Sequence, residues 1–251
     1  MQKLEAGLGE KLLIRSNRGI ELTSAGETLL PAAQRLGSLL GEIGEAFPGP
    51  ERSFVLRLGS LETFAATHVA KLVGGYKKVD PRVEYMIQTG SSHFLMHMLA
   101  ESKLDLAFVS YPATTEPLRT ELVIKQELVL LAPRAARDPY LPPPRDLPLI
   151  VQRPKCSYSE RYLSYVEANN LPIPKVVEAG SIEALLELVE QGLGIAIAPR
   201  SLASRRRRQI RIVPLVPLGA DRWIRIHLIS NLSTSNAAVK PFIIHCCQQK
   251  F

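Results

Sequence analysis

Three short segments place a glycine and a serine where an apolar strand is expected to give way to a helix. They are residues 59–62 (GSLE), 90–93 (GSSH) and 180–183 (GSIE). Serine is a favoured helix N-cap, and the first amides of a helix carry partial positive charge that attracts anions. Glycine and serine are also ordinary turn and cap residues. One junction alone is therefore uninformative, and an anion site requires that the three junctions converge.

The sequence lacks the common catalytic and nucleotide-binding motifs. It has no Gly-x-Ser-x-Gly elbow, no GxxxxGK[ST] loop and no HExxH pair. His93 and His97 have the i, i+4 spacing of two metal ligands, but the glutamate and an obvious third ligand are missing. We therefore expect a protein that is not an enzyme and holds no metal or cofactor. His93 is then expected to bond locally or to edge a cleft.

Composition limits the class of protein. The 251 residues are 46% hydrophobic, enough for a sizeable core in one or two domains. No apolar run approaches the roughly 18 residues of a membrane span and no signal peptide is evident, so we expect a cytoplasmic protein without membrane contact. The 31 Lys and Arg residues against 24 Asp and Glu residues give a formal net charge of +7. This charge favours anionic partners, whether DNA or a small metabolite.

The three cysteines suggest neither a disulfide framework nor a metal cluster. Cys246 and Cys247 are adjacent, and Cys156 has no CxxC partner. We expect all three to be reduced. Cys156 is then either a packed or ligand-lining thiol or a redox sensor whose partner is not evident.

Residues 7–27 (GLGEKLLIRSNRGIELTSAGE) predict a small β-hairpin followed by a helix. Residues 12–14 form an apolar run, 17–19 (NRG) suit a tight turn, and 20–22 alternate like a returning strand. Ser24 and Glu27 have the spacing of a capping box at a helix start. A hairpin with a cationic tip ahead of a long helix is the order used by a DNA-binding wing.

At these residues the chain resembles the LysR-type transcriptional regulators, whose N-terminal winged helix-turn-helix ends in a pattern similar to KLEAGLGEKLLIRSNRGIELTSAGE (residues 3–27). The family places two further helices and most of the recognition helix before the position of Met1. The resemblance therefore implies an N-terminally truncated chain with a winged-helix remnant. The candidates that remain for phosphate or minor-groove contact are Gln2, Lys3, Arg15 and Arg18. Such contacts provide little base discrimination.

Residues 24–47 repeat apolar side chains at alternating steps of four and three, the spacing of a two-helix seam. On periodicity alone, this helix either pairs with a second copy or packs on its own domain. The resemblance favours the linker helix through which LysR-type proteins dimerise, so we expect a homodimer or homotetramer. The predicted dimerisation residues are Leu29, Leu36, Leu40, Ile43 and Phe47.

Beyond residue 52, strands and helices alternate, which predicts parallel sheets. One βαβαβ set is expected over residues 54–109 and a second over residues 149–198, hence two α/β lobes. Segments 210–215 and 223–229 are expected strands that, by resemblance, return to the first lobe of a periplasmic-binding-protein-like pair. The expected division is a winged-helix remnant at 1–22, a linker helix at 23–50, lobe I at 51–131 and 203–251, and lobe II at 132–202.

Open α/β sheets bind ligands at the carboxyl ends of their strands, which is where the glycine-serine junctions lie. The resemblance implies an effector between the lobes, against the helices after the first and second strands and the first turn of lobe II. We expect this effector to be small and anionic. The residues that match these positions are Ser60, Thr63, Ser91, Ser92, Cys156 and Ser157.

Three other motifs are interpreted as structural. Residues 192–199 (GLGIAIAP) resemble a family signature in which glycines allow close packing of helix and strand. Residues 103–108 (KLDLAF) resemble the family's entry into its third strand, for which we expect a scaffold role. The arginine run 205–208 is expected to form a solvated loop, and contact with phosphate or a partner subunit is its alternative.

The sequence thus predicts a LysR-type DNA-binding regulator that senses a small effector between two α/β lobes. The alternative is a stand-alone small-molecule-binding protein without specific DNA binding, because its helix-turn-helix is incomplete.

Overall fold

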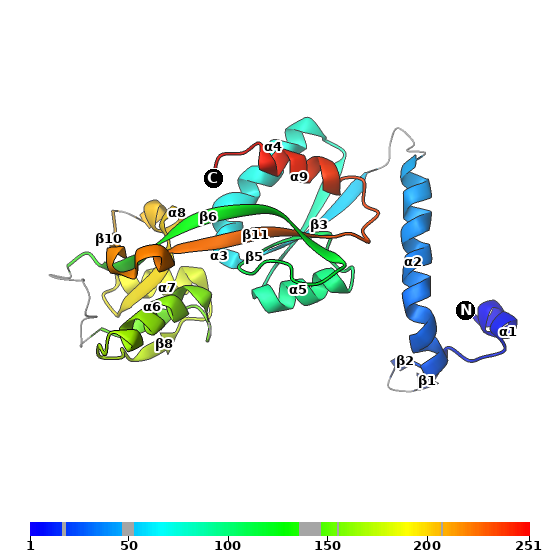
Figure 1. Cartoon of the computed structure of the whole chain (residues 1–251), viewed down its shortest axis with the longest axis horizontal. Helices are drawn as coiled ribbons and strands as arrows, with labels where there is room; N and C mark the ends of the chain where they lie inside the picture. Colours follow the sequence, from blue (N-terminus) through cyan, green and yellow to red (C-terminus); the bar gives the residue numbers. More distant parts are fainter. Residues whose placement is uncertain (17–18, 47–52, 136–146, 155, 207) are drawn as a thin grey trace.

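The computed structural model describes residues 1–16, 19–46, 53–135, 147–154, 156–206 and 208–251. An N-terminal helix, hairpin and long helix precede an α/β domain (Figure 1). The antiparallel pairing of the first two strands confirms the predicted hairpin, whose turn residues 17–18 lie outside the described residues. These N-terminal elements are α1 (Gln2–Leu8), β1 (Leu13–Ser16), β2 (Gly19–Leu22) and α2 (Ser24–Ala46).

The start of α2 differs from the predicted capping box by one residue. Thr23, rather than Ser24, caps the helix: its Oγ1 accepts a hydrogen bond from the Gly26 amide (3.0 Å). The same hydroxyl donates to the Lys11 carbonyl (2.6 Å). Thr23 is the cap because its one hydroxyl then bonds both to the helix start and to the base of the hairpin.

The described strands of the α/β domain form one sheet in the order β4-β3-β5-β11-β6-β9-β7-β8, with β10 beside β6. β3 pairs in parallel with β4 and β5, and β7 pairs in parallel with β8 and β9, which confirms both predicted parallel sets. The antiparallel strands β6 and β11 join the two sets. The bounds are β3 (Phe54–Ser60), β4 (Val83–Thr89), β5 (Leu106–Val109), β6 (Leu118–Pro133), β7 (Leu149–Val151), β8 (Val176–Glu178), β9 (Ile195–Pro199), β10 (Ile210–Pro214) and β11 (Trp223–Asn231).

β6 passes from one lobe to the other. Up to Glu127 it pairs with β11, and from Leu128 onward it pairs with β9 and β10. We therefore define lobe I as residues 53–127 and 223–251, and lobe II as residues 128–222. The outward crossing lies slightly before the predicted boundary at residue 131.

The return to lobe I comes later than the sequence predicted. The assignment of residues 203–222 to lobe I is wrong, because β10 pairs with the lobe II end of β6 and its Val213 packs in the lobe II core. The chain returns at Trp223, where β11 begins to pair with Glu127.

Lobe I packs helices against both faces of its strands (Figure 1). α4 (Ala70–Val79) and α9 (Val239–Cys247) cover one face, and α5 (Ser92–Ala100) covers the other. Gly59 allows α5 to come close, because a Cβ there would lie 2.7 Å from Leu104 Cδ1 and 3.0 Å from Leu95 Cδ2. The short α3 (Glu62–Phe64) and the π-helical turn η1 (Ala65–Val69) connect β3 to α4.

Lobe II is also covered on both faces. α6 (Ser157–Ala168) and η3 (Val216–Arg222) pack on one side, and α7 (Ile182–Glu190) with α8 (Arg200–Ala203) on the other. A Cβ at Gly194 would lie 2.6 Å from the Pro148 carbonyl oxygen, in agreement with a packing role for residues 192–199. η2 (Ser204–Arg206) follows α8.

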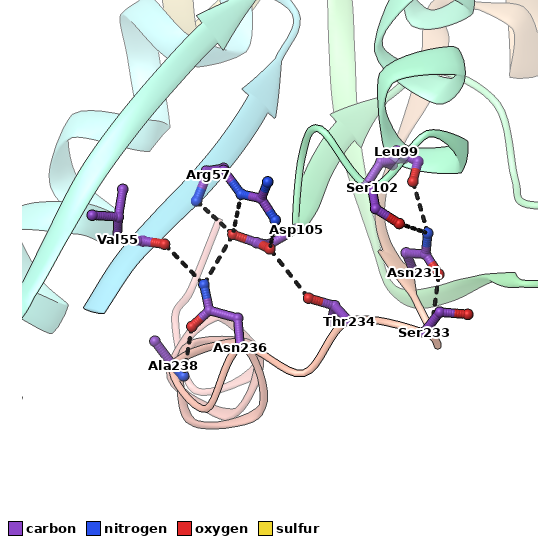
Figure 2. A network of polar contacts seen from close by, with 10 residues as sticks. All are labelled: Val55, Arg57, Leu99, Ser102, Asp105, Asn231, Ser233, Thr234, Asn236 and Ala238. Carbon is purple, nitrogen blue, oxygen red and sulfur yellow. Dashed lines mark hydrogen bonds and ion pairs between the residues drawn. The ribbon is translucent and has the colours of Figure 1, made fainter. Parts of the chain in front are cut away.

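Asp105, in the 103–108 motif, is a buried anchor of lobe I (Figure 2). Its carboxylate accepts hydrogen bonds from the Arg57 amide (2.8 Å) and Nη2 (2.7 Å). It also accepts from Thr234 Oγ1 (3.1 Å) and Asn236 Nδ2 (3.0 Å), and Asn236 Nδ2 donates to the Val55 carbonyl (2.8 Å). One carboxylate therefore ties β3 to the segment between β11 and α9, the scaffold role expected of this motif.

The sequence analysis did not predict the long strand β6, the C-terminal helix α9 or the short 3-10 helices η2 and η3. These additional elements leave the expected α/β class unchanged. Among the helices of the described residues, none is long and apolar enough to cross a membrane.

Candidate functional site

A cavity of about 340 Å³ lies where the two lobes meet, at the carboxyl ends of β3, β4 and β5. The starts of α3 and α5 line it from lobe I, and the segment after β7 with the start of α6 lines it from lobe II. The lining residues are Leu61, Glu62, Thr63, Gly90, Ser91, Ser92, His93, Ser110, Tyr111, Gln152, Arg153, Pro154, Cys156, Ser157 and Tyr158.

The first turn of α5 borders this cavity. Ser91 is the N-cap, as predicted, and its Oγ accepts a hydrogen bond from the Phe94 amide (3.3 Å). Ser92 is held in place by Ser110 at the end of β5: its Oγ accepts from the Ser110 amide (2.9 Å) and lies 2.9 Å from Ser110 Oγ. The helix start and the neighbouring strand end are therefore hydrogen-bonded to each other along one wall of the cavity.

Thr63 and Tyr158 join the lobes at the base of the cavity. Thr63 Oγ1 lies 2.6 Å from the Tyr158 hydroxyl oxygen, and both side chains are buried. Burial raises the pKa of Tyr158, outweighing the opposite effect of the Thr63 hydrogen bond. Tyr158 therefore stays protonated and provides a neutral hydroxyl at the junction of the lobes.

Glu62 makes a second connection between the lobes. One carboxylate oxygen accepts the amide of Ile182, the first residue of α7 (3.2 Å). The other accepts a hydrogen bond from Gln152 Nε2 and lies 3.4 Å from Arg153 Nη2. A lobe I carboxylate thus occupies the positive end of a lobe II helix, a favourable placement for an anion.

This contact changes the interpretation of the junction at residues 180–183. Ser181 is the predicted N-cap of α7, and its Oγ accepts the Ala184 amide (3.1 Å). Because Glu62 also bonds to this helix start, the third junction binds a carboxylate of the protein itself rather than contributing to the cavity lining.

Five of the six predicted effector residues line the cavity: Thr63, Ser91, Ser92, Cys156 and Ser157. Ser60 does not. It is fully buried at the end of β3, and its Oγ donates to the Leu61 carbonyl (3.0 Å). The predicted cap at Ser60 is wrong, because β3 continues to Ser60 and Leu61 precedes α3 instead.

Sequence reasoning missed several lining residues. Gln152 and Arg153 directly follow β7, so the rule that ligands bind at carboxyl ends of strands was a usable signal for them. Glu62 stands one residue before Thr63, and Tyr158 one residue after Ser157. Their inter-lobe contacts had no signal in the sequence, since the partners are at least 90 residues apart.

The predicted DNA-contact residues lie in the N-terminal segment. Gln2 and Lys3 are exposed on α1. Arg15 belongs to β1, but the position of its side chain is outside the described structure, as is the whole of Arg18.

The predicted dimerisation residues lie along α2, which runs unbroken through the described residues to Ala46. Leu36 is 58% exposed and Leu29 is half-buried. The side chains of Leu40 and Ile43 lie outside the described structure, as does Phe47.

The cysteines are free thiols, as expected from their spacing. Cys156 is half-buried and borders the cavity. Burial raises the pKa of Cys246 to about 12, so this thiol is unreactive at neutral pH.

The arginine run at 205–208 is only partly solvated. Arg206 forms ion pairs with Glu183 and with Glu190 (2.7 Å), both on α7. Arg205 and Arg208 are exposed, and residue 207 lies outside the described part of the chain.

Two α/β lobes joined by crossing strands, with a cavity where they meet, define a two-lobed ligand-binding domain. Residues 51–249 match the family model "LysR substrate binding domain". The chain belongs to the LysR family of transcriptional regulators.

Named relatives agree with this assignment, and solved structures share the fold. The uncharacterised HTH-type transcriptional regulator YusT of Bacillus subtilis (strain 168) is 31% identical over 246 residues, 97% of this chain and 82% of that protein. The HTH-type transcriptional regulator YofA of Bacillus velezensis is 34% identical over 202 residues, 80% of this chain and 69% of that protein. A full-length OxyR variant from Pseudomonas aeruginosa shares the fold with a TM-score of 0.75 at 20% identity, covering 99% of this chain and 83% of that chain.

Proposed function

We propose that this LysR-family chain senses a small anionic effector in the cavity between its lobes and transmits binding to the N-terminal segment. The observation that carries the proposal is the cavity of about 340 Å³ lined by residues of both lobes. A ligand held there contacts both lobes at once, so it has different contacts in a closed and an open arrangement. Such differential contact is what a ligand needs to shift a conformational equilibrium.

The lining favours an anionic group next to Arg153. The Arg153 side chain is 46% exposed, and Ser157 and Cys156 lie close to it in sequence at the start of α6. The first turns of α5 and α6 add amides and partial positive charge. The carboxylate of Glu62 does not oppose this placement strongly, because its hydrogen bonds to Ile182, Gln152 and Arg153 already compensate its charge.

A solved relative of the same fold supports the ligand class. The effector-binding domain of BenM, with a TM-score of 0.63 at 18% identity, was solved with its effector benzoate, a carboxylate. We propose only the class of ligand from this likeness, a small molecule with at least one carboxylate or comparable oxyanion.

The test is a thermal-shift screen of the whole chain with carboxylates, amino acids and phosphorylated metabolites, because a ligand that binds the folded state raises the melting temperature. Each hit is then titrated by calorimetry into the parent, Arg153→Gln and Ser157→Ala. We expect at least a tenfold loss of affinity in Arg153→Gln. The matched control is Arg208→Gln, which removes an exposed cation outside the cavity. A hit that binds all four proteins equally contradicts the assignment of the cavity.

A further inference from the structure

A second cavity, of about 410 Å³, lies on the strands that cross between the lobes. Trp223, Arg225 and His227 of β11 line it, because alternate residues of a strand face the same side. Lys125 of β6 lies directly opposite Arg225 in the antiparallel register, and Arg161 of α6 closes the cavity from lobe II. This cavity shares Ser110 with the proposed effector cavity but is otherwise separate from it.

The second cavity is strongly cationic. Lys125, Arg161 and Arg225 line it, and the carboxylate among its lining residues is Asp221, whose side chain is 78% exposed and lies 3.7 Å from Arg161. Within the described residues, neither Lys125 nor Arg225 has an acidic partner within ion-pair distance. Two cations therefore stand side by side with no counter-charge, an arrangement that an anion would stabilise.

His227 is a buried polar group at this cavity without a partner. The residue is 7% exposed, and its buried Nδ1 has no hydrogen-bond partner among the described residues. Burial, and secondly the charge of Arg225, lower the pKa of His227. Buried polar groups are normally hydrogen-bonded, so this ring has unused hydrogen-bonding capacity beside the two unpaired cations.

We propose that this cavity binds a multivalent oxyanion, with Lys125 and Arg225 supplying the charge, Arg161 closing over it and His227 contributing from the strand face. The anion would be a phosphorylated compound or a polycarboxylate, since both present several oxygens to clustered cations. Because β6 and β11 connect the lobes and Arg161 belongs to lobe II, the bound anion stabilises the arrangement of the lobes seen here. Its binding and that of the effector are then coupled through the same conformational equilibrium.

Calorimetric titration of the whole chain with pyrophosphate, and separately with citrate, at constant ionic strength tests the proposal. The parent is compared with Lys125→Gln/Arg225→Gln and with the control Lys71→Gln/Lys240→Gln, which removes two exposed lysines elsewhere in lobe I. We expect at least tenfold weaker binding in the cavity variant and less than twofold change in the control. The preferred ion identifies whether phosphate or carboxylate oxygens are recognised.

A second measurement tests the role of His227. An anion raises the pKa of this ring when it binds, so binding near pH 6.5 takes up a proton, and the measured heat varies with the ionisation enthalpy of the buffer. This variation should disappear in His227→Gln. If the double variant fails to fold by circular dichroism, Arg161→Gln replaces it, with an expected loss of at least threefold. Equal weakening in the cavity and control variants, or no binding of either ion at millimolar concentration, overturns the proposal.

Discussion

Thr63 Oγ1 and the Tyr158 hydroxyl oxygen, contributed by different lobes, lie 2.6 Å apart in a buried contact. This pair and the carboxylate of Glu62 join the lobes beside the proposed effector cavity. A conformational change that separates the lobes would therefore break these two connections, and one that leaves the lobes together would keep them.

Removing one hydroxyl of the inter-lobe pair should destabilise the domain. Tyr158→Phe and Thr63→Val each leave the other hydroxyl buried without its partner, at an expected cost of about 1 to 3 kcal/mol in the free energy of unfolding. The double variant should cost less than the sum of the two, by roughly 1 kcal/mol. Urea denaturation of all four proteins measures this cycle. Strict additivity would show that the two hydroxyls do not interact.

Asp105→Asn should be clearly destabilising, because Asp105 is fully buried and its carboxylate accepts hydrogen bonds from Arg57, Thr234 and Asn236. Hydrogen bonds to a charged group contribute about 1.5 to 3 kcal/mol. We expect a loss of about 2 kcal/mol overall, since the Arg57 side chain is 36% exposed and keeps part of its hydration.

The control for this variant is Asp80→Asn, which breaks the surface ion pair with Arg82. It should cost distinctly less than Asp105→Asn in chemical denaturation. Equal losses would mean that burial of Asp105 does not matter.

The stability of the domain should fall on mild acidification, in part through His68. Burial, followed by the charges of Lys71 and Arg205, lowers the pKa of His68 below its usual 6.5. The unfolded state then binds the proton more readily than the folded state does. The stabilising contribution of neutral His68 is therefore present above pH 6.5 and is lost as pH falls through that value. His68→Gln should show a shallower loss of unfolding free energy between pH 7.5 and pH 5.5. His97→Gln, on the exposed surface of α5, serves as control and should follow the parent.

Leu36→Asp with Leu40→Asp should weaken self-association, because both positions belong to the predicted seam and Leu36 is 58% exposed in the single chain. Sedimentation velocity should show a shift from dimer toward monomer. Thr28→Asp, an exposed position on α2 outside the seam, should leave the dimer intact. An unchanged dimer in the double variant would place the interface elsewhere.

DNA binding by this chain should be weak and tolerant of sequence, since Gln2, Lys3, Arg15 and Arg18 suit phosphate contacts. A retardation assay should show affinity falling steeply with salt and similar affinities for promoter and random DNA. Lys3→Ala should lower the salt slope by about 1. Tight, sequence-selective binding would contradict this prediction.

Local patterns in the sequence determined the elements and their class. The hairpin, the α2 helix, the two parallel sets and the caps at Ser91 and Ser181 follow from residue types within a few positions of one another. Such features depend on short-range geometry, which a sequence displays directly. The strand β6 was not predicted, because it is half-exposed in lobe I and buried on both faces in lobe II. No single periodicity of apolar residues therefore runs along it.

Tertiary structure decided which of these elements form the site. Glu62 meets the start of α7, and Thr63 meets Tyr158, only because the crossing strands bring together segments that are 120 and 95 residues apart, respectively. The same long-range packing buries Ser60, whose sequence context looked equal to that of Ser91. Burial and inter-lobe contact are properties of the whole fold, so no local pattern distinguishes a serine that lines the cavity from one that lies beneath it.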